Sequence, residues 1–398
     1  MKKLSALLLL IAILLSMICG CETTEENKIS YKTVSYGYFD TVTTIVGYES
    51  SQAKFADECN RIFSILGEYH KLFDIYHEYE GINNLYTVNK LVDGKHQVVK
   101  VDRKIIDMLL MAKEMHALTG GKMNIAMGSV LSIWHDYRTE GIDDPSNAQL
   151  PPMELLTEAA KHTDINNLII DEENSTVFLA DPVMTLDVGA FAKGYAVEMT
   201  ARALEAAGKS NYALNVGGNI RTVGGKADGS KWKTGIENPA NTEEYIEYVG
   251  LKDNAIVTSG SYQRYYTVIV SAKCRSCDWV YDESIGIPEQ DVQPNTPPSK
   301  ITSKNTCPVC GEKIRRTSKQ FHHIIDNETL MPSEGLLSVS IICTDSGLGD
   351  GLSTALFCMS IEEGMALINS IDGAEAMWVT EDEVVYYSGG FINHKNAQ

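Results

Sequence analysis

The sequence predicts a fold that mixes α-helices with β-strands, and three observations support that prediction. Apolar residues recur at helical spacing after Ser51, from Phe55 to Leu66. Residues 36–48 nearly alternate in polarity and are rich in Thr, Val and Tyr, as strands are. Residues 212–216 form a short apolar run that ends in paired glycines. The chain of 398 residues is 44% apolar and 22% charged, which is an ordinary globular composition with ample length for a core.

The first residues resemble a bacterial export signal. Two lysines precede an apolar run, residues 4–18, that is too short for a comfortable membrane span. The Ile-Cys-Gly-Cys sequence that follows resembles a lipobox, so we expect residues 1–20 to be a lipoprotein signal peptide and Cys21 to carry a lipid. Residues 21–30 would then be a tether holding the exported protein at the outer face of the bacterial cell membrane. An uncleaved N-terminal anchor is the alternative.

The remaining elements follow in order along the chain. We expect a second amphipathic helix at 102–118, a helix at 153–161, and a hairpin at 168–179. Thr185 to Val188 predicts a short apolar strand that turns through Gly189 into a helix ending at 207. Further strands are expected at 212–216, 255–257 and 266–271.

The turn after Asp187 is suited to an anionic ligand. A helix N-terminus offers unpaired N–H groups and a positive dipole end, and Lys193 adds a full charge. An ordinary strand-to-helix connection with a surface lysine is the alternative. Much later in the chain, Asp350 and Thr354 are four residues apart, so on a helix they share one face and could hold a Mg²⁺ ion.

The formal net charge of −19 argues against nucleic acid as the main partner. Any anionic ligand must therefore meet local positive charge, which Lys193 and a divalent cation could supply.

Two C-x-x-C pairs predict a four-thiolate metal site, with two disulfides as the alternative in an exported protein: Cys274, Cys277, Cys307 and Cys310.

Several of these stretches together resemble the ApbE family of flavin transferases. They occur in the family's order: 187–195, the Asn-Val-Gly-Gly-Asn of 215–219, the Thr-Ser-Gly of 258–260, the His-His-Ile-Ile-Asp of 322–326, and 350–354. The resemblance implies an α+β fold, in which helices surround a two-lobed mixed sheet and the ligand lies in a cleft. It covers residues 31–272 and 319–392, and it implies that 273–318 are an insertion.

The family's activity implies Mg²⁺-dependent transfer of FMN from FAD to a threonine hydroxyl of an acceptor protein, with release of AMP. Two alternatives remain: hydrolysis of FAD to FMN and AMP at the same site, and a non-catalytic flavin-binding electron-transfer lipoprotein.

The resemblance also implies roles for individual residues. The residues expected to contact FAD are Phe39, Tyr76, Lys122, Met123, Asn124, Asp187, Lys193 and Ile325. The Mg²⁺ ligands would be Ala190, Asp350 and Thr354, and His323 and Asp350 are the catalytic candidates. Lys122-Met123-Asn124 departs from the family pattern, which weakens any role for those side chains. Ala190 could contribute only its carbonyl oxygen or a bound water.

The insertion resembles rubredoxin in the residues that follow the first cysteine pair, 278–282, 286–288 and 294–296. Pro298 and Asn305 stand where that fold keeps aromatic core residues, so the metal would have to contribute more of the stability. Thiolates suit both iron and zinc. We favour iron slightly, as an electron carrier beside the flavin, and keep a structural ribbon or a docking surface for the acceptor protein as alternatives.

Overall fold

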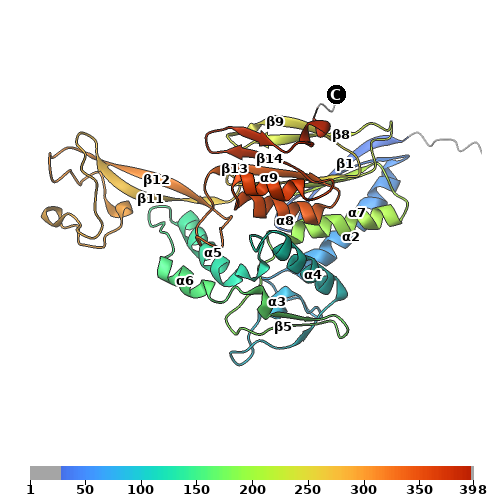
Figure 1. Cartoon of the computed structure of the whole chain (residues 1–398), viewed down its shortest axis with the longest axis horizontal. Helices are drawn as coiled ribbons and strands as arrows, with labels where there is room; N and C mark the ends of the chain where they lie inside the picture. The colour runs from blue at the N-terminus through green and yellow to red at the C-terminus, as the bar shows by residue number, and fades with distance from the viewer. Residues whose placement is uncertain (1–27, 396–398) are drawn as a thin grey trace, which may run out of the picture.

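The structure is a computed structural model that describes residues 28–395, so the predicted signal peptide and Cys21 lie outside it. No helix within 28–395 is both long and apolar enough to cross a bilayer. The elements drawn in Figure 1 are β1 (Ile29–Tyr38), β2 (Thr41–Glu49), α2 (Gln52–Phe73), α3 (Leu85–Asn89), β3 (Val99–Lys100), α4 (Arg103–Leu118), α5 (Gly128–Asp143), α6 (Met153–Ala160), β4 (Leu168–Asp171), β5 (Thr176–Leu179), α7 (Ala192–Ala206), β6 (Tyr212–Val216), β7 (Asn219–Val223), β8 (Trp232–Asn238), β9 (Asn241–Leu251), β10 (Ala255–Gly260), β11 (Tyr265–Cys274), β12 (Ile314–His322), β13 (Leu336–Cys343), α8 (Ser346–Phe357), α9 (Ile361–Asn369), β14 (Glu375–Thr380) and β15 (Val385–Tyr387).

The largest sheet has eight strands in the order β1-β2-β6-β7-β10-β13-β14-β15. Each pair of neighbours is antiparallel, so the strand directions differ from the mixed sheet that we expected. The pairs β1–β2, β6–β7 and β14–β15 are consecutive strands joined by short turns, and a short turn can join only antiparallel strands. Helices pack on an antiparallel sheet, which is the α+β arrangement, so the predicted α+β class is confirmed.

The two faces of the sheet are covered by different elements. Ile341 and Cys343 on β13 pack into the hydrophobic cluster that includes α4 and α8. Ile342, between them, packs into a second cluster beneath the β8–β9 hairpin. This alternation is the period-two pattern of a strand buried on both faces. Figure 1 shows α8 and α9 on one side of β13 and β14, with β9 on the other.

Two local expectations were wrong. Residues 36–48 are not one strand but parts of β1 and β2, because Phe39 and Asp40 form the turn of a hairpin with φ of 52° and 51°. Thr185 to Val188 is not a strand either. Its backbone bonds to loops instead: Leu186 N–H donates to Asn89 Oδ1 at 2.8 Å, and Asp187 N–H donates to the Ile125 carbonyl at 2.8 Å.

The helix starts were predicted more accurately. Ser51 and Asp102 act as N-caps for α2 and α4, and each side chain accepts a hydrogen bond from an N–H of the first turn. Helix α7 ends just before Gly208, whose φ of 69° suits only glycine well.

The second lobe contains α3 to α6 and a small sheet in the order β3-β5-β4. Strands β11 and β12 form a separate ribbon, which pairs Tyr265 with His322 at one end and Cys274 with Ile314 at the other. Figure 1 shows this ribbon leaving the body and carrying the cysteine-bearing segment at its far end. The predicted insertion, 273–318, begins in β11 and ends within β12.

Helices α7 and α8 approach closely because Gly194 has no side chain. A β-carbon at Gly194 would lie 2.4 Å from Asp350 Cβ and 2.4 Å from the Ser346 carbonyl oxygen. The Gly194 N–H also donates to Asp350 Oδ2 at 2.7 Å. This glycine therefore sets the position of the Asp350 carboxylate.

We predict that Gly194→Ala lowers the free energy of unfolding by about 1–3 kcal/mol, because the methyl group overpacks the crossing of the two helices. Chemical denaturation measures this loss. The matched control is Gly389→Ala, where an added β-carbon meets nothing within 4 Å and a change below about 0.5 kcal/mol is expected. Equal losses in both variants would contradict the close approach of α7 and α8.

Candidate active site

One cavity of about 920 Å³ is lined by residues of both lobes. It brings together positions as distant in sequence as Phe39 and Thr354. All twelve residues that the sequence predicted for FAD, Mg²⁺ and the base line it: Phe39, Tyr76, Lys122, Met123, Asn124, Asp187, Ala190, Lys193, His323, Ile325, Asp350 and Thr354. They therefore share one site, while the role of each remains a prediction.

The carboxylate of Asp350 lies among the charged and polar side chains that line the cavity. It is only 5% exposed, and it accepts the Gly194 N–H from the first turn of α7. Lys193 Nζ lies 3.8 Å from Asp350 Oδ1 and also hydrogen bonds to Asn219 Oδ1. Burial lowers the pKa of Lys193, and the nearby Asp350 carboxylate opposes that shift. A carboxylate and an ammonium thus face the same part of the cavity.

The donor atoms at this end of the cavity suit a hard cation. Asp350 offers a carboxylate, and Thr354 offers a hydroxyl one helical turn further along α8. Ala190, in the turn before α7, can add only a carbonyl oxygen. Magnesium prefers oxygen ligands of these kinds, so the residues present fit the ion that the sequence predicted.

Asp187 lies in the turn that leads into α7. Its Oδ1 accepts the Gly189 N–H at 2.8 Å, which fixes the turn. Burial raises the pKa of Asp187, although the Gly189 N–H and the charges of Arg138 and Arg264 oppose the shift. The turn that leads into α7 is therefore held by its own aspartate.

The two adjacent histidines have different surroundings. His322 Nε2 donates to the Ser333 carbonyl at 2.8 Å, and its Nδ1 accepts the Ile324 N–H at 3.2 Å, so both ring nitrogens are used. His323 instead lines the cavity, and its Nδ1 lies 3.3 Å from the Arg264 carbonyl. Because a carbonyl can only accept, Nδ1 carries the proton and Nε2 keeps a free lone pair.

Burial and the positive charges of Arg264 and Arg138 lower the pKa of His323 to about 3. His323 is therefore neutral at physiological pH, as a proton acceptor must be. An anionic ligand beside the two arginines would offset their charge and make His323 a stronger base.

Sequence reasoning missed the two arginines. Arg138 comes from α5 and Arg264 from the loop before β11, and both line the cavity. Burial and the charge of Arg264 lower the pKa of Arg138. Two like charges on one wall favour an anionic ligand. Neither arginine belongs to a sequence motif, and only the tertiary fold brings them together.

Tyr76 presents an open aromatic surface at the cavity. Tyr76 is 55% exposed, and its ring lies against His135 with centroids 5.7 Å apart and the ring planes tilted by 33°. Asp74 fixes this loop by accepting the N–H groups of Tyr76 and His77 at 2.7 and 3.0 Å. A planar ligand could stack here at little entropic cost because the loop is already ordered.

The 122–124 loop lines the cavity with side chains that already have structural partners. Lys122 Nζ lies 3.0 Å from both Asp326 Oδ2 and Glu328 Oε1. Met123 is 1% exposed, and Asn124 caps a short 3₁₀ turn through Ala126 N–H. Any contact from this loop to a ligand is therefore expected to come mainly from the backbone, as the sequence indicated.

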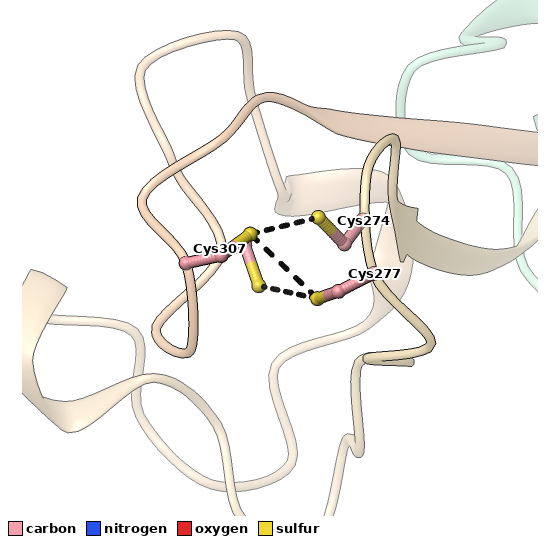
Figure 2. A group of neighbouring side chains, drawn as sticks. Cys274, Cys277 and Cys307 are labelled. Atoms are coloured by element: carbon pink, nitrogen blue, oxygen red, sulfur yellow. Dashed lines mark hydrogen bonds between the residues drawn. The ribbon is translucent and has the colours of Figure 1, made fainter.

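The four cysteines form a separate group on the ribbon. Their Sγ atoms lie within 4.8 Å of one another, and Figure 2 shows Cys274, Cys277 and Cys307 pointing toward a common centre. Cys310 completes the group, and none of the four forms a disulfide in the structure.

Comparisons with known proteins point to one family. The sequence model of the ApbE family matches residues 39–294 and 301–378. A FAD:protein FMN transferase of Klebsiella pneumoniae is 25% identical over 83% of this chain and 84% of its own. One from Treponema pallidum is 26% identical over 74% and 70%.

Solved structures are similar in fold. The ApbE protein of Thermotoga maritima has a TM-score of 0.69 at 24% identity, covering 92% of this chain and all 100% of its own. The flavin transferase ApbE of Vibrio cholerae has a TM-score of 0.64 at 20% identity, covering 92% and 99%.

We predict that Arg264→Met raises the pKa of His323 above its present value of about 3, because a positive charge is removed while the backbone carbonyl stays. NMR titration of the histidine ring C–H signals measures the shift. Arg103→Met, an exposed arginine on α4, should leave that pKa unchanged. An unchanged pKa of His323 in Arg264→Met would show that the charge of Arg264 does not affect the His323 ring.

Proposed function

The chain belongs to the ApbE family, and we propose that it transfers the FMN moiety of FAD to an acceptor protein. The curated relatives that carry this activity in their names support the proposal. The observation that carries it is the single cavity in which Asp350, Lys193 and His323 meet two arginines and an open aromatic ring. This combination suits a ligand with a diphosphate and a flat ring.

We place the diphosphate of FAD at the N-terminus of α7. Lys193, Arg138 and Arg264 offer positive charge there, and Tyr76 offers a stacking surface for the isoalloxazine. Asp350, Thr354 and the Ala190 carbonyl would hold Mg²⁺, which would neutralise phosphate charge as the leaving group departs.

The proposed reaction is phosphoryl transfer to a threonine of the acceptor protein. The hydroxyl oxygen bonds to the phosphorus on the FMN side, the bond to the bridging oxygen breaks, and AMP leaves. His323 Nε2 accepts the hydroxyl proton, since its Nδ1 is held by the Arg264 carbonyl. Lys193 and the two arginines stabilise the charge that develops on the phosphate oxygens.

We also propose that the protein is an exported lipoprotein that works at the outer face of the cell membrane. The apolar run and lipobox-like sequence before Cys21 support this proposal. A lipid on Cys21 would hold the catalytic body near membrane-bound acceptor proteins.

The transfer is tested with the purified protein, FAD, Mg²⁺ and a threonine-bearing acceptor domain, whose intact mass is then measured. We expect an FMN-sized gain that EDTA abolishes and that Asp350→Asn slows by at least about 100-fold, because a charge-stabilising group is lost. Asp57→Asn, on the exposed face of α2, is the matched control and should retain the rate.

An acceptor whose threonine is replaced by valine should gain no mass. If FAD is instead consumed to free FMN and AMP while the acceptor stays unmodified, the protein is a hydrolase and the transferase proposal fails. Retained flavin without AMP release would indicate a flavin carrier.

We predict that cells expressing the protein incorporate labelled palmitate into it, and that Cys21→Ser abolishes the label because the acylated thiol is gone. Cys19→Ser, two residues earlier, should keep the label. Labelling that survives in Cys21→Ser would rule out lipidation at this cysteine.

A further inference from the structure

The spacing of the four cysteine sulfurs matches a tetrahedral metal site. Cys274 Sγ lies 3.4 Å from Cys310 Sγ, and Cys277 Sγ lies 3.6 Å from both Cys307 Sγ and Cys310 Sγ. Metal–sulfur bonds of about 2.3 Å in a tetrahedron place the sulfurs about 3.8 Å apart. The four atoms therefore surround a space of the right size for one ion.

Backbone N–H groups donate to three of the four cysteine sulfurs. Ser276 N–H donates to Cys274 Sγ at 3.3 Å. The N–H groups of Trp279 and Glu312 donate in the same way to Cys277 and Cys310. Each donor lies two residues after its cysteine, with two such bonds in the first loop and one in the second. Hydrogen bonds around the ligands commonly orient the side chains of a metal site.

The surface beside the sulfurs is basic, in a chain whose formal net charge is −19. Lys273, Arg275 and Arg315 line a second pocket together with Cys274. Lys273 and Arg315 are direct partners across the β11–β12 ribbon, and like charges in that position destabilise a ribbon. Four thiolates around a divalent ion carry a net charge of −2, which would offset this repulsion.

The end of the ribbon has little hydrophobic support of its own. Its buried cluster consists of five residues: Ala272, Tyr281, Ile287, Val292 and Ile301. A core of this size supplies little folding free energy, and small domains of this kind commonly depend on a metal.

The ribbon also separates the cysteines from the cavity. Arg264 lines the cavity, and the nine residue steps from Tyr265 to Cys274 span about 30 Å at the usual rise of a strand. Figure 1 shows the ribbon extended away from the body. The expectation of an electron carrier beside the flavin therefore gains no support from this arrangement.

We propose that Cys274, Cys277, Cys307 and Cys310 hold one iron or zinc ion as a structural tetrathiolate centre. The cations of Lys273, Arg275 and Arg315 balance its negative charge. The ion ties the two cysteine loops together and folds the end of the ribbon, independently of the chemistry in the cavity.

The first test is metal analysis of the full chain, purified without chelators from cells supplied with both metals. We expect one ion per chain, which elemental analysis identifies as zinc or iron. Cys277→Ser and Cys310→Ser should lose the ion, whereas Cys59→Ser, at a buried position of α2, should keep it. Less than a tenth of an ion per chain, with the four cysteines reactive as free thiols or paired as disulfides, would overturn the proposal.

A second test keeps all four ligands and changes only the charge. Lys273→Met with Arg315→Met should weaken metal affinity about three- to tenfold in competition with a chelator at low salt. Lys32→Met with Lys252→Met makes the same charge change at exposed positions elsewhere and should leave the affinity unchanged. Equal affinity in both double variants would overturn the charge balance, and circular dichroism confirms that each variant is folded.

Discussion

The contact between α7 and α8 determines the geometry of the active site. The Gly194 N–H bonds to the buried Asp350 carboxylate, and a side chain at 194 would push the helices apart. An ion pair and a hydrogen bond reinforce the same junction: Arg202 Nη2 lies 2.6 Å from Asp345 Oδ2, and Glu198 Oε2 accepts the Ser346 N–H at 2.9 Å. Because a buried carboxylate is costly without such partners, the loss of one contact would disturb the others. The proposed magnesium ligands and Lys193 depend on this junction.

Local signals in the sequence predicted a large part of the fold. Ser51 marked the start of α2 correctly because a cap acts through bonds within its own first turn. Local signals did not predict the turn at Phe39 and Asp40. The alternation of polar and apolar residues continues through this tight turn, and its positive φ values occur at residues other than glycine. The segment before Asp187 looks like a strand in sequence, but its hydrogen-bonding partners are loops rather than a neighbouring strand.

The site could be predicted where the residues lie in ordered motifs and not where the fold alone assembles them. Asp187, Lys193 and Asp350 belong to glycine-rich stretches whose order along the chain is informative. Arg138 and Arg264 are ordinary arginines in sequence, on a helix and a loop that are more than a hundred residues apart. The low pKa of His323 depends on those charges, so it too could not have been inferred before the fold was known.

The β11–β12 ribbon has a consequence for how the chain can change over evolution. Strand β11 leaves the body and β12 returns beside it, with Cys274 opposite Ile314 at the far end. Everything between those two positions could be replaced by a two-residue turn without altering the path of either strand at the body. The cysteine-bearing end is therefore an insertion that the rest of the fold does not need. It can be gained, exchanged or lost while the cavity, built entirely from other elements, keeps its shape.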